Sequence, residues 1–311
     1  MHSKKDTGCP CPCQGNRMRP LSCGARIFRL PGAERIGYEC LMDVLTSVIL
    51  GIVQGLTEFL PISSSGHLVL FQHGFGFHEP ELLLDTSLHV GTLLAVILYF
   101  RRDIAAMGRE LRAVAAPGES GESPGPRLER LRSSMVTWVV VGNVPTAVIG
   151  IVFRGPLEGL FGSISVVGIM LLVTGGLLAV TRVVPERNRR LGLWAALAVG
   201  TAQGLAIIPG VSRSGATIAC GLLMGLDREV AARFSFLLSV PAIAGALGLQ
   251  LVLGNATGPG AIVLLSGGMA AAAVGLVALK LLMRLVRHGR FAWFAPYCWA
   301  VGLVVLGMTR F

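Results

Sequence analysis

Charged and aromatic residues are scarce in this chain. Only 14% of the 311 residues are charged and 6% are aromatic, whereas 53% are hydrophobic. Soluble domains carry about 25% charged residues, so the composition excludes an ordinary soluble protein and indicates several membrane-spanning helices. The 41 glycines agree with this, because small residues let membrane helices pack closely.

Basic stretches interleaved with aromatic residues are also missing, which argues against nucleic-acid binding despite a formal net charge of +10. Five of the seven cysteines fall within the first 40 residues, without the C-x2-C spacing of common zinc sites. This polar, basic segment lacks the apolar core of a signal peptide. We therefore expect residues 1–41 to be a disordered tail or a non-native extension before a start at Met42, rather than a metal-binding tail.

Long hydrophobic runs, by contrast, are abundant. About 20 apolar residues are needed for a helix to cross a bilayer. Six segments meet or approach that length: 84–100, 134–153, 162–183, 232–253, 261–283 and 291–309. Two shorter stretches, 44–60 and 193–208, each end in a Pro/Gly/Ser cluster and are followed by another short apolar piece, 66–72 and 216–226. Such broken pairs are typical of re-entrant helix-loop-helix segments.

The two broken pairs are related in sequence. "GIVQGLTEFLPISSSGHL" from Gly51 aligns without a gap on "GTAQGLAIIPGVSRSGAT" from Gly200, at an offset of 149. This is an internal repeat. The single membrane domain, 42–311, thus divides into repeat one (42–184) and repeat two (190–311), each with one re-entrant pair and three crossings. Because three is odd, the repeats must have inverted topology.

The distribution of loop charges supports that topology. Arginine and lysine concentrate in the segments 101–132, 182–190 and 280–290, whereas 73–83 and 254–260 contain neither and 154–161 contains only Arg154. The positive-inside rule places the basic segments in the cytoplasm. We predict an all-α integral membrane protein of this design, with the Pro/Gly/Ser-rich segment 103–132 as a mobile cytoplasmic loop.

The first broken pair contains Gln54 and Glu58, which share one helix face, followed by Ser63, Ser64, Ser65 and His67. A carboxylate at membrane depth costs about 2.5–3.5 kcal/mol on insertion scales, so a cation, a metal ion or a water-filled cavity has to offset it. The alternative is a carboxylate that reaches the membrane surface. The glutamate, the histidine and three hydroxyls together favour a functional site.

The second broken pair contains "PGVSRSGAT", residues 209–217. A helix that begins here offers N–H groups, the positive end of its dipole and hydroxyl donors, all of which suit a phosphate. Arg213 adds a planar guanidinium that binds phosphate oxygens in pairs. The alternative is that Arg213 only pairs with Glu58 and staples the repeats together. If the two hairpins meet near the midplane, we expect one polar site for a phosphorylated lipid.

From Met42 onward the chain resembles the bacitracin-resistance family of undecaprenyl pyrophosphate phosphatases. The resemblance rests on "GIVQGLTEFLPISSSGHLVL", "LDTSLHVGTLLAVILYF" and "IIPGVSRSGATI". It implies a multi-pass enzyme of the bacterial inner membrane that removes the terminal phosphate of undecaprenyl pyrophosphate, recycling the carrier lipid for peptidoglycan synthesis and conferring bacitracin resistance.

The resemblance also assigns roles, which remain expectations. The catalytic residues are Glu58, His67, Arg213 and Ser64, with His67, Ser64 or water as the nucleophile. The phosphate-binding residues are Ser63, Ser65, Ser212, Arg213, Ser214 and Thr217. Gln54 and Glu58 hold a divalent cation, Mg2+ or Ca2+, although the family pattern also allows two glutamates there. A homodimer is left open, and the alternative function is a transporter or flippase of a polyprenyl phosphate lipid, which needs the anion site but no nucleophile.

Overall fold

The computed structural model describes residues 32–74, 82–115, 134–153, 155, 160, 163–185, 187–253 and 259–309. Over these residues the protein is all-helical: it has no strand, and its one isolated bridge joins Arg189 to Leu226. The expected tail 1–41 lies mostly outside this part. Its last ten residues are helical, because α1 begins at Gly32 and runs to Phe59.

Four helical segments are long and apolar enough to cross a membrane: α6 (Met135–Val152), the first 22 residues of α11 (Arg228–Leu253), α12 (Ala261–Arg287), and the 3-10 turn η1 (Phe291–Phe294) with α13 (Ala295–Met308). A fifth candidate is α3 (Leu82–Tyr99) together with α4 (Arg101–Ala115), which bends away by 77°. These confirm a multi-pass helical membrane protein.

Two details differ from the predicted elements. The expected crossing at 162–183 is α8 (Ile164–Val180), whose 17 residues span about 25 Å at 1.5 Å per residue, less than the bilayer core of about 30 Å. The loop expected over 103–132 is helical up to Ala115, so that part of the prediction is wrong. Its apolar residues Ile104, Met107 and Leu111 repeat at helical spacing; residues 116–132 lie outside the described part.

Both predicted broken pairs are present as helix, break and helix. The first consists of α1 and α2 (Ser64–Gly74), and the second of α9 (Leu193–Leu205) and α10 (Arg213–Leu223). Prolines explain the breaks, since Pro61 and Pro209 have no N–H to continue a helix. Each break also contains a residue of positive φ, Ser63 at 69° and Gly210 at 94°, which turns the chain sharply.

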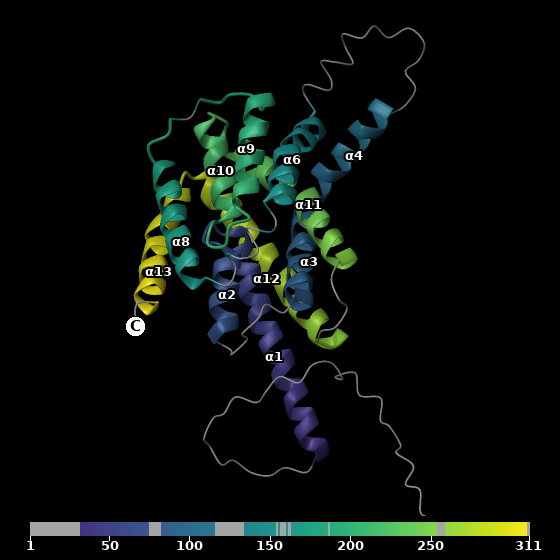
Figure 1. The fold of residues 1–311 in the computed structure, drawn as a ribbon. Helices are drawn as coiled ribbons and strands as arrows, with labels where there is room; N and C mark the ends of the chain where they lie inside the picture. Colours follow the sequence, from purple (N-terminus) through teal and green to yellow (C-terminus); the bar gives the residue numbers. More distant parts are fainter. Residues whose placement is uncertain are drawn as a thin grey trace, which may run out of the picture.

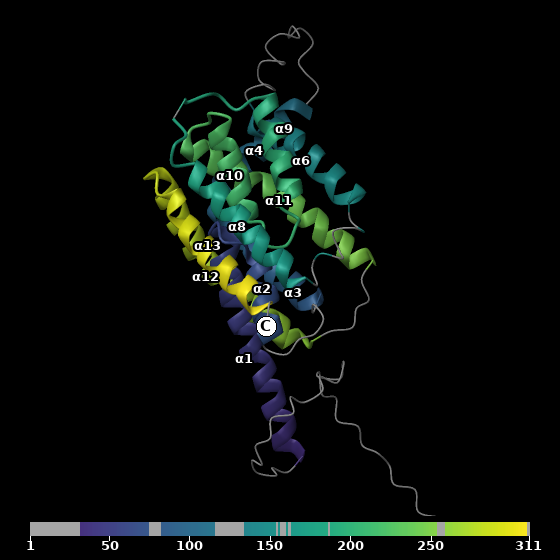
Figure 2. The ribbon, with the colours of Figure 1, turned by 60° about the vertical axis from the view of Figure 1, so that its left-hand side comes forward.

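The helices pack in pairs, which Figures 1 and 2 show from two sides. α1 runs along α12, which also packs on α3; α9 packs on α6; and α8 runs beside α13. Glycines allow the close approaches: a Cβ on Gly51 would meet the Gly267 carbonyl, and a Cβ on Gly200 would meet the Gly142 carbonyl. The broken ends of the two pairs meet in the middle of the molecule.

Candidate active site where the two hairpins meet

Glu58 lies at the end of α1, at the first break, and is 6% exposed. Its Oε2 accepts a hydrogen bond from the Gln54 Nε2 at 3.0 Å and another from the Ser64 Oγ at 2.6 Å. Gln54 is one turn earlier on the same helix, and Ser64 is the first residue of α2. The break thus folds the serine back onto the carboxylate.

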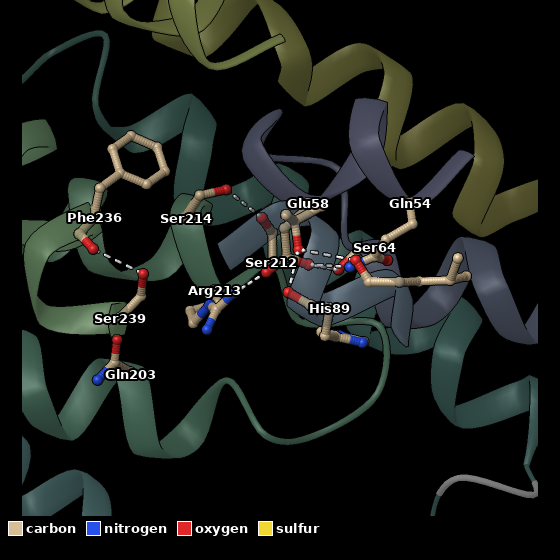
Figure 3. A network of polar contacts seen from close by, with 12 residues as sticks. Gln54, Glu58, Ser64, His89, Gln203, Ser212, Arg213, Ser214, Phe236 and Ser239 are labelled. Atoms are coloured by element: carbon tan, nitrogen blue, oxygen red, sulfur yellow. Dashed lines mark hydrogen bonds and ion pairs between the residues drawn. The ribbon is translucent and has the colours of Figure 1, made fainter. Parts of the chain in front are cut away.

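Arg213 is the first residue of α10, in the second hairpin. Its Nη2 forms an ion pair with the Oε1 of Glu58, so the two halves of the chain join at one carboxylate (Figure 3). The Oγ of Ser212 caps α10 by accepting from the Gly215 N–H at 3.1 Å, and the Ser212 N–H donates to the Thr174 Oγ1 at 3.1 Å. These bonds fix the backbone from which Arg213 extends.

The ion pair borders a small pocket that is partly open to solvent. Its polar lining consists of Glu58, Arg213, Ser214, Thr92, Ser235 and Ser239, and its apolar lining of Phe59, Val96, Phe236 and Ile243. The carboxylate side chain is only 3% exposed, whereas the Arg213 side chain is 25% exposed. A ligand in the pocket would therefore reach the guanidinium more readily than the carboxylate, which suits an anion.

Sequence reasoning missed three hydroxyl-bearing residues that line this pocket and come from outside the two hairpins. Ser235 and Ser239 come from α11, and Thr92 comes from α3. The two serines are i and i+4 within "SFLLS", so they share a helix face. Two serines at that spacing inside the expected crossing 232–253 could have indicated a polar helix face toward the site.

The other predicted phosphate-binding residues fall into two groups, those that line the pocket and those that hydrogen-bond within or between helices. Ser214 lines the pocket beside Arg213. The Ser63 hydroxyl caps α2 by accepting from the Gly66 N–H at 3.3 Å and lies 3.4 Å from the Ser65 hydroxyl. Thr217 donates to the Arg213 carbonyl at 2.7 Å and contacts the Ser235 hydroxyl. Ser63, Ser64, Ser65, Ser212 and Thr217 do not line the pocket in this structure. Ser64 is connected to it through the Glu58 carboxylate, and Ser212 through its contact with the Ser214 hydroxyl at 3.2 Å.

His67 lies on α2 and points elsewhere. Its Nδ1 is 2.8 Å from the Ser63 carbonyl oxygen, and its Nε2 is 2.9 Å from the Tyr297 hydroxyl on α13. It is 6% exposed and absent from the pocket lining. The structure thus brings together Gln54, Glu58, Ser64, Ser212, Ser214 and Arg213, and leaves His67 outside that group.

Two buried amide oxygens in the described part of the chain lack a hydrogen-bond partner, the Oε1 atoms of Gln54 and Gln203. These glutamines correspond in the internal repeat. Only Gln54 has a carboxylate beside it, because Ile207 stands where repeat one has Glu58. No three His, Cys, Asp or Glu residues gather anywhere in the described part, this site included. Gln54 and Glu58, the predicted cation ligands, lie side by side, with the Gln54 Nε2 3.0 Å from the Glu58 Oε2.

Comparison with known proteins gives a consistent result. The family model described as "Bacitracin resistance protein BacA" matches residues 47–304. A relative from Desulfatibacillum aliphaticivorans, named undecaprenyl-diphosphatase, is 50% identical in an alignment of 271 positions that covers 85% of this chain and 98% of the relative. Relatives of the same name from Desulforapulum autotrophicum and Desulfosudis oleivorans are 47% and 48% identical, over 85% of this chain and 97% and 98% of their own lengths.

Proposed function

This chain belongs to the bacitracin resistance protein BacA family, and on that premise we propose that the pocket between its hairpins removes the terminal phosphate of undecaprenyl pyrophosphate. The protein is an undecaprenyl-diphosphatase, as its relatives are named. The products are undecaprenyl phosphate and inorganic phosphate. The observation that carries the proposal is the meeting of Glu58 and Arg213, from two hairpins, in the lining of one pocket. Ser64 is joined to this pair by its hydrogen bond to Glu58.

Ser64 is the nucleophile that the geometry favours. Its hydroxyl already donates to the Glu58 carboxylate at 2.6 Å, which is the arrangement of an activated nucleophile and its base. The Ser64 oxygen attacks the terminal phosphorus and forms a P–O bond while the anhydride P–O bond breaks, and Glu58 takes the serine proton. Water then hydrolyses the phosphoserine, and inorganic phosphate leaves. His67 is disfavoured as nucleophile because both ring nitrogens have other partners.

Arg213 binds the terminal phosphate and stabilises charge as the anhydride bond loosens. Phosphoryl transfer depends mainly on positioning and electrostatic stabilisation. Arg213 begins α10, where the helix dipole also favours an anion. The hydroxyls of its neighbours Ser212 and Ser214 lie 3.2 Å apart at this end of the helix. In this proposal Glu58 is the partner of Arg213 before substrate binds, and the substrate phosphate then replaces it. The ion pair is therefore more than a link between the two repeats.

A divalent cation, Mg2+ or Ca2+, fits the neighbouring Gln54 and Glu58. The Oε1 of Gln54 is buried without a hydrogen-bond partner beside a carboxylate, and hard cations take oxygen ligands of these kinds. One carboxylate is sufficient where the substrate phosphates and water complete the coordination. When bound, the cation would neutralise phosphate charge.

We also propose the inverted arrangement of the repeats, in the bacterial inner membrane. The packing is consistent with it: α1 pairs with α12, and the corresponding α9 pairs with α6, the counterpart of α12 in repeat one. The Arg189 N–H donates to the Gly225 carbonyl at 2.9 Å, so the second hairpin enters and leaves at one place, as a re-entrant segment does. A homodimer stays a prediction.

The test is phosphate release from a polyprenyl pyrophosphate by the purified chain in detergent with Mg2+. We expect wild type and the control Ser266→Ala, on α12 outside the pocket, to release phosphate. Ser64→Ala and Glu58→Gln should each lose activity by about 100-fold or more. The names of the relatives support hydrolysis over transport; a wild-type protein that moves the lipid across vesicles without releasing phosphate would reverse that choice.

A further inference from the structure

Two consecutive residues of α13 contact the turn that carries the first half of the site. The Tyr297 hydroxyl is 2.9 Å from the His67 Nε2, and the two rings stack with centroids 5.8 Å apart and an 11° angle between planes. The Cys298 thiol donates to the Pro61 carbonyl at 3.4 Å. The Cys298 contact reaches the start of the break between α1 and α2, at Pro61, and the Tyr297 contact reaches its end through His67.

The hydrogen bonds assign the protonation of His67. The Ser63 carbonyl can only accept, so the Nδ1 of His67 carries the proton and donates to it at 2.8 Å. In the neutral ring the Nε2 is then an acceptor, and the Tyr297 hydroxyl is its donor. With both nitrogens engaged, the ring connects α13 to the Ser63 carbonyl and has no free lone pair for substrate.

The residue held in this way is strained. Ser63 has a φ of 69° without being glycine, a conformation that persists only where the surroundings enforce it. Besides the His67 ring, the His67 N–H donates to the Ser63 carbonyl at 3.2 Å. Directly after Ser63 comes Ser64, whose 2.6 Å hydrogen bond to Glu58 depends on the path of this turn.

We infer that Tyr297, acting through His67 and supported by Cys298, is a positioning residue that holds the Pro61–Ser63 turn and thereby the Ser64 hydroxyl against Glu58. This rests on the proposed function. It assigns His67 to the support of the turn rather than to the chemical step. The nearest alternative is that His67 is itself a general acid or base and that Tyr297 tunes it.

A double-mutant cycle separates these two roles. His67→Phe and Tyr297→Phe keep the stacked rings but remove the hydrogen bond between them. We expect each single variant to lower kcat by about tenfold or more, because a small displacement of reacting groups is costly. The double variant should be no slower than the slower single variant, with KM changed much less than kcat and the pH profile of kcat unmoved. Tyr99→Phe, whose ring packs on Phe100, is the matched control.

Two further measurements complete the test: the activity of a conservative variant at Cys298, and hydrogen exchange at the turn, which needs no substrate. Cys298→Ser keeps a donor for the Pro61 carbonyl and should stay close to wild type, whereas Cys298→Ala should lose activity. Hydrogen exchange of the Gly66 and His67 amides, both bonded to Ser63, should accelerate in Tyr297→Phe and not in Tyr99→Phe. An inactive His67→Phe beside a fully active Tyr297→Phe, or unchanged exchange at this turn, would overturn the inference. Loss of phosphate release in wild type would instead refute the proposed function, and the exchange result would still stand.

Discussion

Arg213 links the two hairpins through its ion pair with Glu58, and in the proposed reaction this pairing is exchanged before the chemical step. The guanidinium bonds to one carboxylate oxygen of Glu58, while Gln54 and Ser64 bond to the other. A phosphate presents more oxygens to the planar guanidinium than one carboxylate oxygen does. Substrate can therefore draw Arg213 toward the pocket and leave Glu58 free to accept the Ser64 proton.

This exchange predicts that charge alone is insufficient at position 213. Arg213→Lys keeps the positive charge but loses the paired donors, so we expect phosphate release to fall by about 100-fold or more, close to the loss in Arg213→Ala. The matched control is Arg233→Lys, since Arg233 pairs with Asp103 away from the pocket. Full activity in Arg213→Lys would show that the arginine acts only as a point charge.

The two glutamines whose amide oxygens lack a hydrogen-bond partner give a second prediction, which concerns the cation. Gln54→Leu removes the free amide oxygen beside Glu58, so the Mg2+ concentration for half-maximal activity should rise by about tenfold or more. Gln54→Glu adds a carboxylate there and should lower that concentration. Gln203→Leu, in the repeat that has Ile207 in place of a carboxylate, should leave it unchanged. Activity measured across a Mg2+ titration after treatment with a chelator distinguishes these outcomes; equal shifts for both leucine variants would contradict a cation at Gln54.

At this scale the sequence predicted the residues of the hairpins but not their surroundings. Gln54, Glu58, Ser64 and Arg213 could be paired because polar groups at membrane depth need partners and because the repeat aligned the two breaks. The partner of His67 could not be foreseen, since Tyr297 is 230 positions away and reaches it only through the packing of α13. Ser235 and Ser239 were missed because single serines are common in membrane helices.

At the scale of helices, glycine contacts set how closely the hairpins approach their neighbours. Gly51 on α1 faces the Gly267 carbonyl of α12, and Gly200 on α9 faces the Gly142 carbonyl of α6. Gly51 and Gly200 correspond in the repeat. In each case an added Cβ would collide with backbone atoms, which cannot move aside as a flexible side chain can.

We therefore expect Gly51→Ala and Gly200→Ala to push their helix pairs apart and destabilise the protein by about 1–3 kcal/mol. Thermal unfolding in detergent should show a lower Tm for both. Gly176→Ala on α8 is the control, because its added methyl group would have no atom within 4 Å. A Tm for Gly200→Ala equal to that of Gly176→Ala would mean that α9 and α6 are not held at this distance.

Helix boundaries could be predicted where a nearby residue in the sequence determines them. Pro61 and the Pro209–Gly210 pair dictate the breaks wherever the helices lie. The expectation of a loop after Arg102 failed because composition was weighed above spacing. All of the segment's prolines and serines, and all of its glycines except Gly108, come after Ala115. The part before Ala115 repeats Ile104, Met107 and Leu111 at helical intervals.

At the scale of the whole molecule, the proposed inverted arrangement would explain why the site contains two unlike hairpins. Repeat one supplies Glu58 and Ser64, and repeat two supplies Arg213 at the position that corresponds to Ser64. Hairpins that enter from opposite faces meet end to end inside the bilayer, where each can contribute different groups to one pocket. Parallel repeats would place both breaks at the same depth but side by side, facing the same solvent.

Thiol labelling tests this arrangement through two corresponding positions. Asp43, near the start of the first pair, and Gly192, the residue before α9, are related by the offset of 149. In a chain whose other cysteines are serine, Asp43→Cys should react with a membrane-impermeant maleimide from outside the cell, and Gly192→Cys only after the cytoplasmic face is opened. Ile262→Cys and His288→Cys, at the two ends of α12, provide the outside and inside controls. Because the loop charges place 254–260 outside and 280–290 inside, the controls must label from opposite faces; if they do while Asp43→Cys and Gly192→Cys label from the same face, the repeats are not inverted.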